Sequence, residues 1–239
     1  MYDYPELCAA TDVWAAAIAR FAGVDEKLTR EDDYAAAWHR SDLAFSQTCG
    51  YPFTHQFRSA LSLVGTPHYA VRGCDGFRYS SFVFGRKSSD AAQYRGAVAS
   101  INTADSMSGM LALRAFFNRQ AKAGIFFKNA VISGSHLNSL ALLQRGEADV
   151  CAIDAVCVDY VKRFRPELLV GLVELGQTPL VPGLPYVTRD ANVGRWQMAV
   201  AEAVADPALA DVRQALRIGG FTTTRPADYD VILQLEDSL

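Results

Sequence analysis

Residues 102–110 combine small hydroxyl side chains with a glycine at the point where an apolar strand is expected to turn into a helix. Ser106, Ser108 and Gly109 stand where the first turn of that helix would form. Such a turn has unpaired backbone N–H groups and a partial positive charge, so it is suited to binding an anion. The alternative is that Asp105 or Ser106 only caps the helix. The sequence leaves both interpretations open.

Two further segments have the same composition at an expected strand end. In residues 132–136, Ser135 offers a hydroxyl, and His136 could donate to an anion when protonated, although it could also be a surface or capping residue. In residues 46–52, Ser46 and Thr48 are candidate donors and Tyr51 a candidate wall. Ligands of open α/β sheets bind outside the carboxyl ends of the strands, where all three segments are expected.

Acidic and aromatic candidates are fewer. Asp3 and Asp154 could face a ligand amine, or each could cap and solvate a neighbouring helix. Tyr2 is one of several tyrosines near loops that could line a cleft.

Patterns typical of enzymes are missing from the sequence. It contains no Gly-x-Ser-x-Gly elbow, His-Glu-x-x-His helix, phosphate-loop lysine motif or dinucleotide glycine pattern. Cys49 and His55 could be imagined as nucleophile and base, but sequence proximity does not establish a catalytic geometry. Five cysteines at irregular spacing fit neither a disulfide framework nor a zinc site, and Cys151 and Cys157 are expected in the core. We therefore expect no catalytic activity, cofactor or metal, and a reduced compartment is the simpler interpretation.

Composition limits the partners and the location. The 239 residues carry 23 Lys and Arg against 26 Asp and Glu, a formal net charge of −3, which argues against a nucleic-acid partner. The apolar stretch 121–131 is interrupted by Lys122, Lys128 and Asn129, so no membrane insertion is expected. Residues 1–6 contain two carboxylates and a proline and do not resemble a secretory signal. The chain as written is expected in the cytoplasm, or in the periplasm if its start is truncated.

Alternating strands and helices must position these segments. Apolar residues at three-to-four spacing predict a helix over 5–22 that ends at Gly23, and a second helix is expected over 33–39. Strands are expected at 43–45, 61–64, 81–84, 97–101, 130–132, 150–153 and 168–175, and helices at 110–120, 137–143, 193–204 and 207–218. This alternation predicts an α/β fold with mainly parallel sheets.

The chain is expected to form two lobes. Segments 79–86 and 176–185 are candidates to carry it from one lobe to the other and back. The predicted first lobe is discontinuous, residues 1–82 and 181–239, the second lobe spans 83–180, and a ligand cleft is expected between them.

Several motifs together resemble the phosphate- and phosphonate-binding branch of the type 2 periplasmic binding proteins, which are solute-binding components of ABC importers. They occur in the family's order, nearly along the entire chain, at residues 1–6, 46–52, 105–109, 134–136, 146–154 and 178–186. The resemblance is specific for fold and family and unspecific for the ligand. Family members typically begin with an apolar strand that runs into the Met-Tyr-Asp motif, whereas this chain starts at Met1 of that motif.

The resemblance implies a function. It implies a two-lobed, non-enzymatic protein that closes by hinge motion over a small phosphonate- or phosphate-like anion, with an ABC permease as partner. The implied ligand-binding residues are Tyr2, Asp3, Ser46, Gln47, Thr48, Tyr51, Ser106, Ser108, Gly109, Ser135, His136 and Asp154. The alternatives are a cytoplasmic enzyme of the same fold in thiamine- or menaquinone-type precursor biosynthesis, and a ligand-sensing module.

Overall fold

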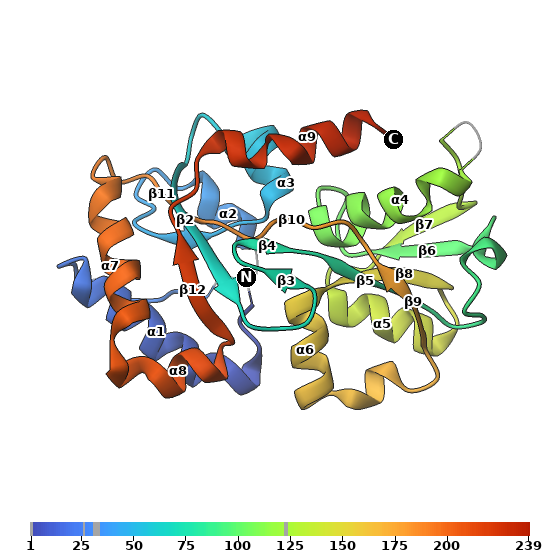
Figure 1. The fold of residues 1–239 in the computed structure, drawn as a ribbon, viewed down its shortest axis with the longest axis horizontal. Coiled ribbons are helices and arrows are strands. Elements are labelled where there is room, and N and C mark those ends of the chain that lie inside the picture. Colours follow the sequence, from blue (N-terminus) through green and yellow to red (C-terminus); the bar gives the residue numbers. More distant parts are fainter. Residues whose placement is uncertain (1, 26, 31–33, 122–123) are drawn as a thin grey trace. The chain divides into compact units, whose positions relative to one another are not determined.

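The computed structural model of the chain describes residues 2–25, 27–30, 34–121 and 124–239, and these form two compact units (Figure 1). The last nine residues, which the sequence assigned to the first lobe, group with the second unit. The prediction that a ligand cleft separates two lobes stays a prediction. The first unit consists of Met1–Ala70, Asp75–Arg78 and Pro182–Asp230, and the second of Val71–Cys74, Tyr79–Val181 and Val231–Leu239.

Helices of the first unit form where the apolar periodicity predicted them. The helix expected over 5–22 is confirmed as the 3₁₀ turn η1 (Pro5–Leu7) followed by α1 (Cys8–Phe21), and Gly23 has the left-handed φ of 67° expected after its end. Residue 33 of the second expected helix lies outside the described residues, and α2 spans Tyr34–His39. The remaining helical elements are α3 (Gly50–Pro52), η2 (Phe53–Phe57), α7 (Val193–Ala205), η7 (Pro207–Leu209), α8 (Ala210–Ala215) and η8 (Pro226–Tyr229).

The four-stranded sheet of this unit has the order β1-β11-β2-β12, and its three neighbouring pairs are antiparallel. α7 packs against β2 and β12 and also against α1. The strands are β1 (Ser46–Gln47), β2 (Ser62–Tyr69), β11 (Tyr186–Thr188) and β12 (Ile218–Thr222).

The structure of this sheet differs from the prediction at two strands. The strand expected at 43–45 is displaced to β1, because Ser46 and Gln47 lie opposite β11, while the Leu43 and Ala44 carbonyls accept hydrogen bonds from Arg189 and Thr188. The helix expected over 207–218 forms as η7 and α8 but ends at Ala215, and the strand β12 that follows it was not predicted. Arg217 turns the chain with a φ of 58° before the strand begins.

The five-stranded sheet of the second unit has the order β7-β6-β8-β5-β9. β6 pairs in parallel with β7 and β8, whereas β5 pairs in antiparallel fashion with β8 and β9. The predicted α/β class is therefore confirmed, and its parallel pairs lie in β7-β6-β8. The strands are β5 (Ser81–Gly85), β6 (Val98–Ile101), β7 (Asn129–Ile132), β8 (Val150–Asp154) and β9 (Val173–Gln177), and the short β3 (Cys74–Asp75), β4 (Arg78–Tyr79) and β10 (Val181–Pro182) lie near the unit boundaries in the chain.

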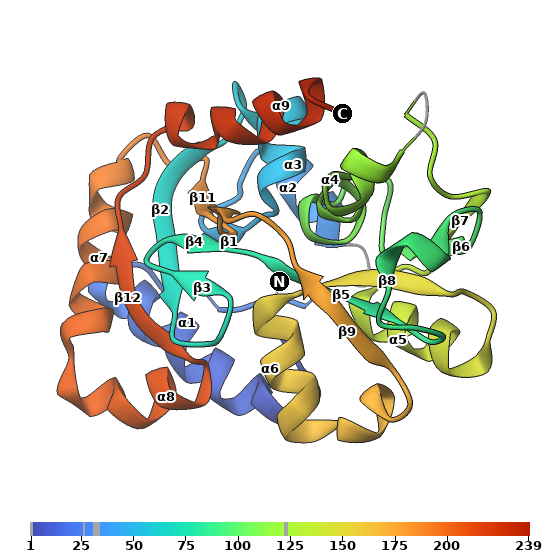
Figure 2. The same ribbon diagram turned by 45° about the vertical axis from the view of Figure 1, so that its right-hand side comes forward.

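Helices cover both faces of this sheet. Figure 2 shows α4 on one face and α5 and α6 on the other. The strand predicted at 168–175 starts late, because Pro166 opens a 3₁₀ turn and Gly171 has a φ of 75°. The helical elements are η3 (Ala91–Tyr94), η4 (Met107–Leu111), α4 (Ala112–Phe117), η5 (Asn118–Gln120), α5 (His136–Arg145), α6 (Ala155–Phe164), η6 (Pro166–Leu169) and α9 (Asp230–Asp237), of which α9 begins in the first unit.

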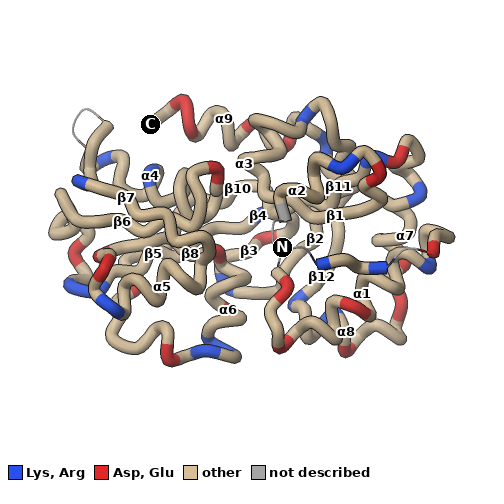
Figure 3. Tube along the Cα trace, turned by 180° about the vertical axis from the view of Figure 1, so that it is seen from behind, with Lys and Arg blue, Asp and Glu red and all other residues tan. Residues whose placement is uncertain are grey.

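The distribution of charged residues along the chain and the length of the helices agree with the composition. Figure 3 shows Lys and Arg interspersed with Asp and Glu along the traces of both units. Across the described part of the chain, no helix has the length and apolarity that crossing a bilayer requires. The five cysteines are free thiols, and Cys151 and Cys157 are buried as predicted.

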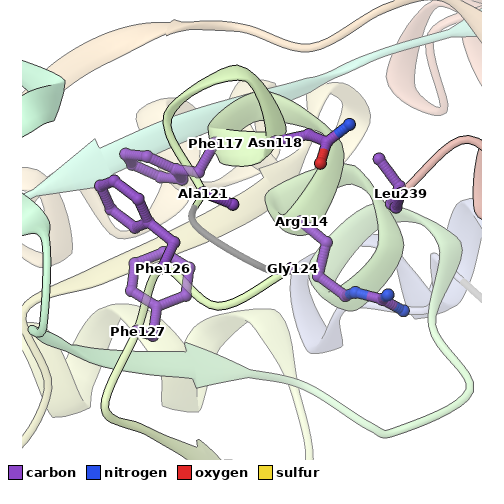
Figure 4. Close-up of a pocket in the computed structure, with 8 residues that line it drawn as sticks. All are labelled: Arg114, Phe117, Asn118, Ala121, Gly124, Phe126, Phe127 and Leu239. Atoms are coloured by element: carbon purple, nitrogen blue, oxygen red, sulfur yellow. The ribbon is translucent and has the colours of Figure 1, made fainter.

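The core of the second unit contains a cluster of phenylalanines. Phe117, 1% exposed, stacks on Phe126 at a centroid distance of 4.5 Å and meets Phe127 edge-on at 5.1 Å. A cavity of about 50 Å³ lies beside this cluster (Figure 4). It is lined by Arg114, Phe117, Asn118, Ala121, Gly124, Phe126, Phe127 and Leu239.

We expect Phe117→Ala to lower the free energy of unfolding by about 3 to 5 kcal/mol, because it removes a buried ring next to an existing void. Chemical denaturation followed by circular dichroism measures this change. Ile125→Ala is the control, since Ile125 is 67% exposed and its truncation should change stability little. Equal losses in both variants would contradict this description of the core.

Candidate functional site

The turn from Ser106 to Gly109 follows β6 and opens a continuous helix over 107–117. Ser106 is its N-cap, and the Ser106 hydroxyl accepts a 3.0 Å hydrogen bond from the Gly109 N–H. The first turn is a π-turn, in which the Leu111 N–H donates to the Ser106 carbonyl at 3.0 Å. π-turns are rare and frequently occur at functional sites. The capping role of Ser106 is therefore present, and the N–H groups of Met107 and Ser108 have no acceptor within the helix.

Ser108 connects this turn to the second predicted segment. Its hydroxyl lies 2.9 Å from Nε2 of His136, the first residue of α5. Ser135 is the N-cap of α5, and its hydroxyl accepts from the Asn138 N–H at 3.1 Å. The structure thus brings together five of the predicted residues from two helix starts: Ser106, Ser108, Gly109, Ser135 and His136.

Pairing of β6 with β7 explains this proximity. Parallel strands have their carboxyl ends at the same edge of the sheet, and the Ser133 and Gly134 N–H groups donate to the carbonyls of Ile101 and Asn102, both at 2.8 Å. A chain of hydroxyls, of which those of Ser100 and Ser139 are buried, fixes the same corner. Ser139 lies 3.0 Å from Ser100 and 2.7 Å from Ser133.

The histidine in this cluster is neutral. Burial lowers the pKa of His136 to about 4, against an ordinary value of 6.5, and the backbone of Ala152 offsets only part of this effect. Without a bound anion the ring of His136 is therefore held in its neutral form, and its role as a donor to an anion stays a prediction. Near neutral pH one ring nitrogen carries a proton and the other accepts, and Nε2 is engaged with Ser108.

Asp154 serves as a helix cap. It ends β8, is 1% exposed, and its Oδ1 accepts from the N–H groups of Val156 at 2.7 Å and Cys157 at 3.4 Å. Burial, together with the charge of Asp154, raises the pKa of the Cys74 thiol to about 12. Asp154 therefore caps a helix, which was the alternative to contacting a ligand.

The first-unit candidates at 46–48 are held by β11 and the segment before it. Gln47 Nε2 donates to the Tyr69 hydroxyl at 3.2 Å and to the Leu184 carbonyl at 3.1 Å, while Ser46 pairs with Val187 in the sheet. Thr48 is fully buried, and its hydroxyl donates to the Cys49 carbonyl at 3.4 Å. Thr48 faces the protein interior in this structure.

Tyr51 and His55 form a stacked pair. Their rings are 3.8 Å apart with an interplanar angle of 10°, and His55 Nδ1 lies 2.9 Å from both the Tyr51 carbonyl and the Thr54 hydroxyl. Cys49 is 8% exposed and is the N-cap of α3. The ring of His55 is therefore positioned by Tyr51 and Thr54.

The N-terminal candidates take part in structural contacts. Tyr2 meets Tyr69 edge-on at 5.0 Å. Asp3 is paired with Arg30, which also contacts Asp12 at 2.8 Å. Burial alone would raise the pKa of Asp3, but hydrogen bonding to Arg30 and its charge outweigh burial and lower it. Arg30 thus already neutralises the carboxylate for which a ligand amine was one of the two alternatives.

One residue of this corner was missed. Asn102 directly follows β6, and a Cβ on Gly109 would lie 1.9 Å from its Oδ1 and 3.3 Å from Cε1 of His136. The sequence position of Asn102, between the strand and the turn at Ser106, is the signal that could have identified it. Among the described residues, no three His, Cys, Asp or Glu side chains are grouped so that they could hold a metal.

Comparison with known proteins identifies the relatives. The sequence profile of a family described as "ABC transporter, phosphonate, periplasmic substrate-binding protein" matches residues 8–230. Searched against individually curated proteins, the sequence has no match.

Solved structures show the same fold at low identity. PhnD1 from Prochlorococcus marinus in complex with methylphosphonate has a TM-score of 0.75 and 16% identity, with 97% of this chain and 92% of that chain covered. A binding protein component of an ABC phosphonate transporter from Pseudomonas aeruginosa has a TM-score of 0.76 and 16% identity, with 97% and 81% covered. An arginine-specific periplasmic binding protein from Salmonella typhimurium has a TM-score of 0.59 and 15% identity, with 86% and 87% covered. The fold is that of the type 2 periplasmic binding proteins, as predicted.

The lowered pKa of His136 predicts a pH dependence of stability. The unfolded chain takes up a proton below about pH 6.5, whereas the folded protein does so only near pH 4, so stability should fall as the pH decreases through this window. Denaturant titrations between these values should show a flatter profile for His136→Asn than for the unchanged protein. Ser89→Ala, which changes an exposed residue without an ionisable side chain, is the control and should leave the profile unchanged. Parallel profiles for the unchanged protein and His136→Asn would contradict the buried neutral imidazole.

Proposed function

The chain belongs to the family of periplasmic substrate-binding proteins of phosphonate ABC transporters, and on this basis we propose that it binds a small phosphonate- or phosphate-like anion for an ABC-type permease. The family is a transporter component that binds its substrate and has no enzymatic role. The observation that supports the ligand class is the contact between Ser108 and His136, which places two helix starts and their hydroxyls at one edge of a sheet.

Neutral donors can hold an anion in such a place. The N–H groups at the first turn of 107–117 point out of the helix, and the helix dipole favours negative charge there. Hydrogen bonds from neutral donors to an ionised acceptor are about twice as strong as neutral pairs. A few of them together supply roughly 8 kcal/mol, which corresponds to micromolar affinity.

The first-unit residues complete the proposed set. We assign Ser46, Gln47 and Tyr51 as the ligand contacts of the first unit, together with Tyr2, on the basis of the sequence resemblance at residues 1–6 and 46–52. Thr48 and Asp3 then act by supporting this set, since Thr48 is buried and Asp3 is paired with Arg30. The proposed motion is hinge closure of the two units over the ligand.

Ligand binding is tested by thermal shift with methylphosphonate, inorganic phosphate, an aminoalkylphosphonate and small carboxylates. A ligand at one hundred times its Kd should stabilise the protein by about 2.7 kcal/mol, or about 5 to 10 °C in Tm. Ser108→Ala should abolish the ligand-induced shift, although loss of the His136 contact will also lower the ligand-free Tm somewhat. Ser89→Ala, at an exposed serine of the same unit, should keep the full shift. No shift with any phosphonate or phosphate would contradict the proposed function.

Hinge closure is tested separately by small-angle X-ray scattering. We expect saturating methylphosphonate to reduce the radius of gyration of the unchanged protein and of Ser89→Ala, and to leave Ser108→Ala unaffected, because closure depends on contacts to the bound ligand. If methylphosphonate binds but the radius of gyration does not change, the proposed hinge closure is wrong, while the proposed ligand class still holds.

A further inference from the structure

Three serine hydroxyls form a continuous hydrogen-bonded chain between β6 and the start of α5. The Ser100 hydroxyl donates to Ser139 at 3.0 Å, so the proton of Ser139 itself is directed to Ser133, 2.7 Å away. The Ser133 hydroxyl in turn donates to a backbone carbonyl, that of Ser135 at 2.9 Å or that of Ile101 at 3.1 Å. Each hydroxyl proton of the chain therefore has an acceptor.

The first two of these serines lie in the interior, where most contacts between a helix and a sheet are apolar. Ser100 is 0% and Ser139 1% exposed, and Leu140 and Leu143 of the same helix are buried beside them. A buried hydrogen bond adds little net stability, because the same groups bond to water in the unfolded chain. A buried network whose members are all satisfied instead holds its surroundings in one arrangement. The serine pair is thus better suited to fixing a geometry than to adding stability.

The geometry next to this pair is that of the contact between Ser108 and His136. Strand β6 contains Ser100 and leads into the turn with Ser108, while Ser139 stands one turn after His136 in α5. The Ser108 hydroxyl and His136 Nε2 are 2.9 Å apart, and about 3.6 Å would no longer be a hydrogen bond. A shift of α5 by about 1 Å over the sheet would therefore break the contact.

We infer that Ser139, together with Ser100, is a positioning residue, which holds α5 at the height over β6 that the contact between Ser108 and His136 requires. The inference rests on the proposed function, because anion binding is assigned to the turns that carry these two residues. Ser139 does not touch the ligand and acts through His136. Removal of the buried hydroxyl pair should therefore weaken anion binding although every proposed ligand contact is still present.

Backbone hydrogen bonds are the alternative source of this order. The Ser133 and Gly134 N–H groups donate to the carbonyls of Ile101 and Asn102, both at 2.8 Å, and tie the turn before α5 to the end of β6. These bonds fix the turn at the strand end, whereas the Ser139 hydroxyl joins the helix itself to the strand that it covers. If the backbone bonds were sufficient, removal of the serine pair would leave anion binding unchanged.

The double variant Ser100→Ala/Ser139→Ala separates positioning from stability. It removes both partners of the buried bond, and Ser133 can still donate to a backbone carbonyl, so Tm should fall by less than about 5 °C. By isothermal titration calorimetry we expect this variant to bind methylphosphonate about tenfold or more weakly than the unchanged protein, because the donors to the anion are no longer held in place.

Leu143→Ala is the matched control. It truncates a buried residue of the same helix and leaves the hydroxyl chain intact. This variant should lose more in Tm than the double variant, because it creates a cavity, but should keep the affinity for methylphosphonate.

The ring of His136 gives a second readout that needs no ligand. With Nε2 engaged by Ser108, the neutral imidazole should adopt one tautomer, which the chemical shifts of its two ring nitrogens identify by nuclear magnetic resonance. In the double variant the ring should populate both tautomers, because the contact with Ser108 is no longer held. In Leu143→Ala the shifts should stay as in the unchanged protein.

Three results would overturn the inference. The double variant could keep either the affinity or the His136 signals of the unchanged protein, or Leu143→Ala could lose as much affinity as the double variant. A fall in Tm of the double variant as large as that of Leu143→Ala would show that the serines serve stability instead. If the unchanged protein does not bind methylphosphonate, the proposed function is wrong, whereas the His136 signals still test the positioning.

Discussion

The parallel pairing of β6 with β7 is the constraint on which the proposed site depends. It brings the carboxyl ends of two strands to one edge, so that the turn after each strand starts a helix at the same corner. Both ends of β6 are fixed by polar contacts. At its start the Val98 N–H donates to Asp149 at 2.9 Å, and at its end Ser100 joins the hydroxyl chain through Ser139. The Ser108 to His136 contact needs this register, because a slip of β7 would carry α5 away from the serine turn.

The carboxylates of Asp149 and Asp3 are paired with basic side chains, whereas the corner at Ser108 and His136 is built from neutral groups. The carboxylate of Asp149 lies 3.0 Å from Arg86 and 2.7 Å from Lys87, and these contacts outweigh the effect of burial and lower the pKa of Asp149. Asp3 is likewise neutralised by Arg30. The corner formed by Ser106, Ser108 and Gly109 instead uses hydroxyls, backbone N–H groups and a neutral imidazole. Selection of an anion at such a corner depends on where donors and acceptors point, since a bare cation would attract any negative charge.

The sequence predicted the parts of the fold that depend on local pattern. Apolar periodicity located α1 and α7, and the hydroxyl-rich turns after 97–101 and 130–132 were correctly placed at helix starts. Elements set by tertiary partners were misplaced. β1 starts at Ser46 because β11 lies opposite it. β12 follows Arg217, whose left-handed backbone conformation cannot be predicted from the pattern of apolar residues.

The roles of side chains were harder to predict than the positions of helices and strands, because these roles also depend on tertiary contacts. The pKa of His136 depends on burial, which a residue type does not reveal. Asp154 is a residue type that often contacts ligands, but here it caps α6, and its Oδ1 accepts a 2.7 Å hydrogen bond from the Val156 N–H. Asn102 was not predicted, because its side chain fits there only for want of a Cβ on Gly109, seven residues further along the chain.

The fold itself cannot choose the ligand. A protein described as specific for arginine and one in complex with methylphosphonate both share this chain's architecture, with TM-scores of 0.59 and 0.75. In folds of this kind the ligand binds outside the carboxyl ends of the strands, where side chains can change while the fold is kept. In this chain a helix start and hydroxyls can hold negative charge but cannot distinguish one tetrahedral anion from another of equal size. The choice of ligand therefore depends on the side chains that these turns present, and Ser108 and His136 are the pair that the parallel strands bring together there.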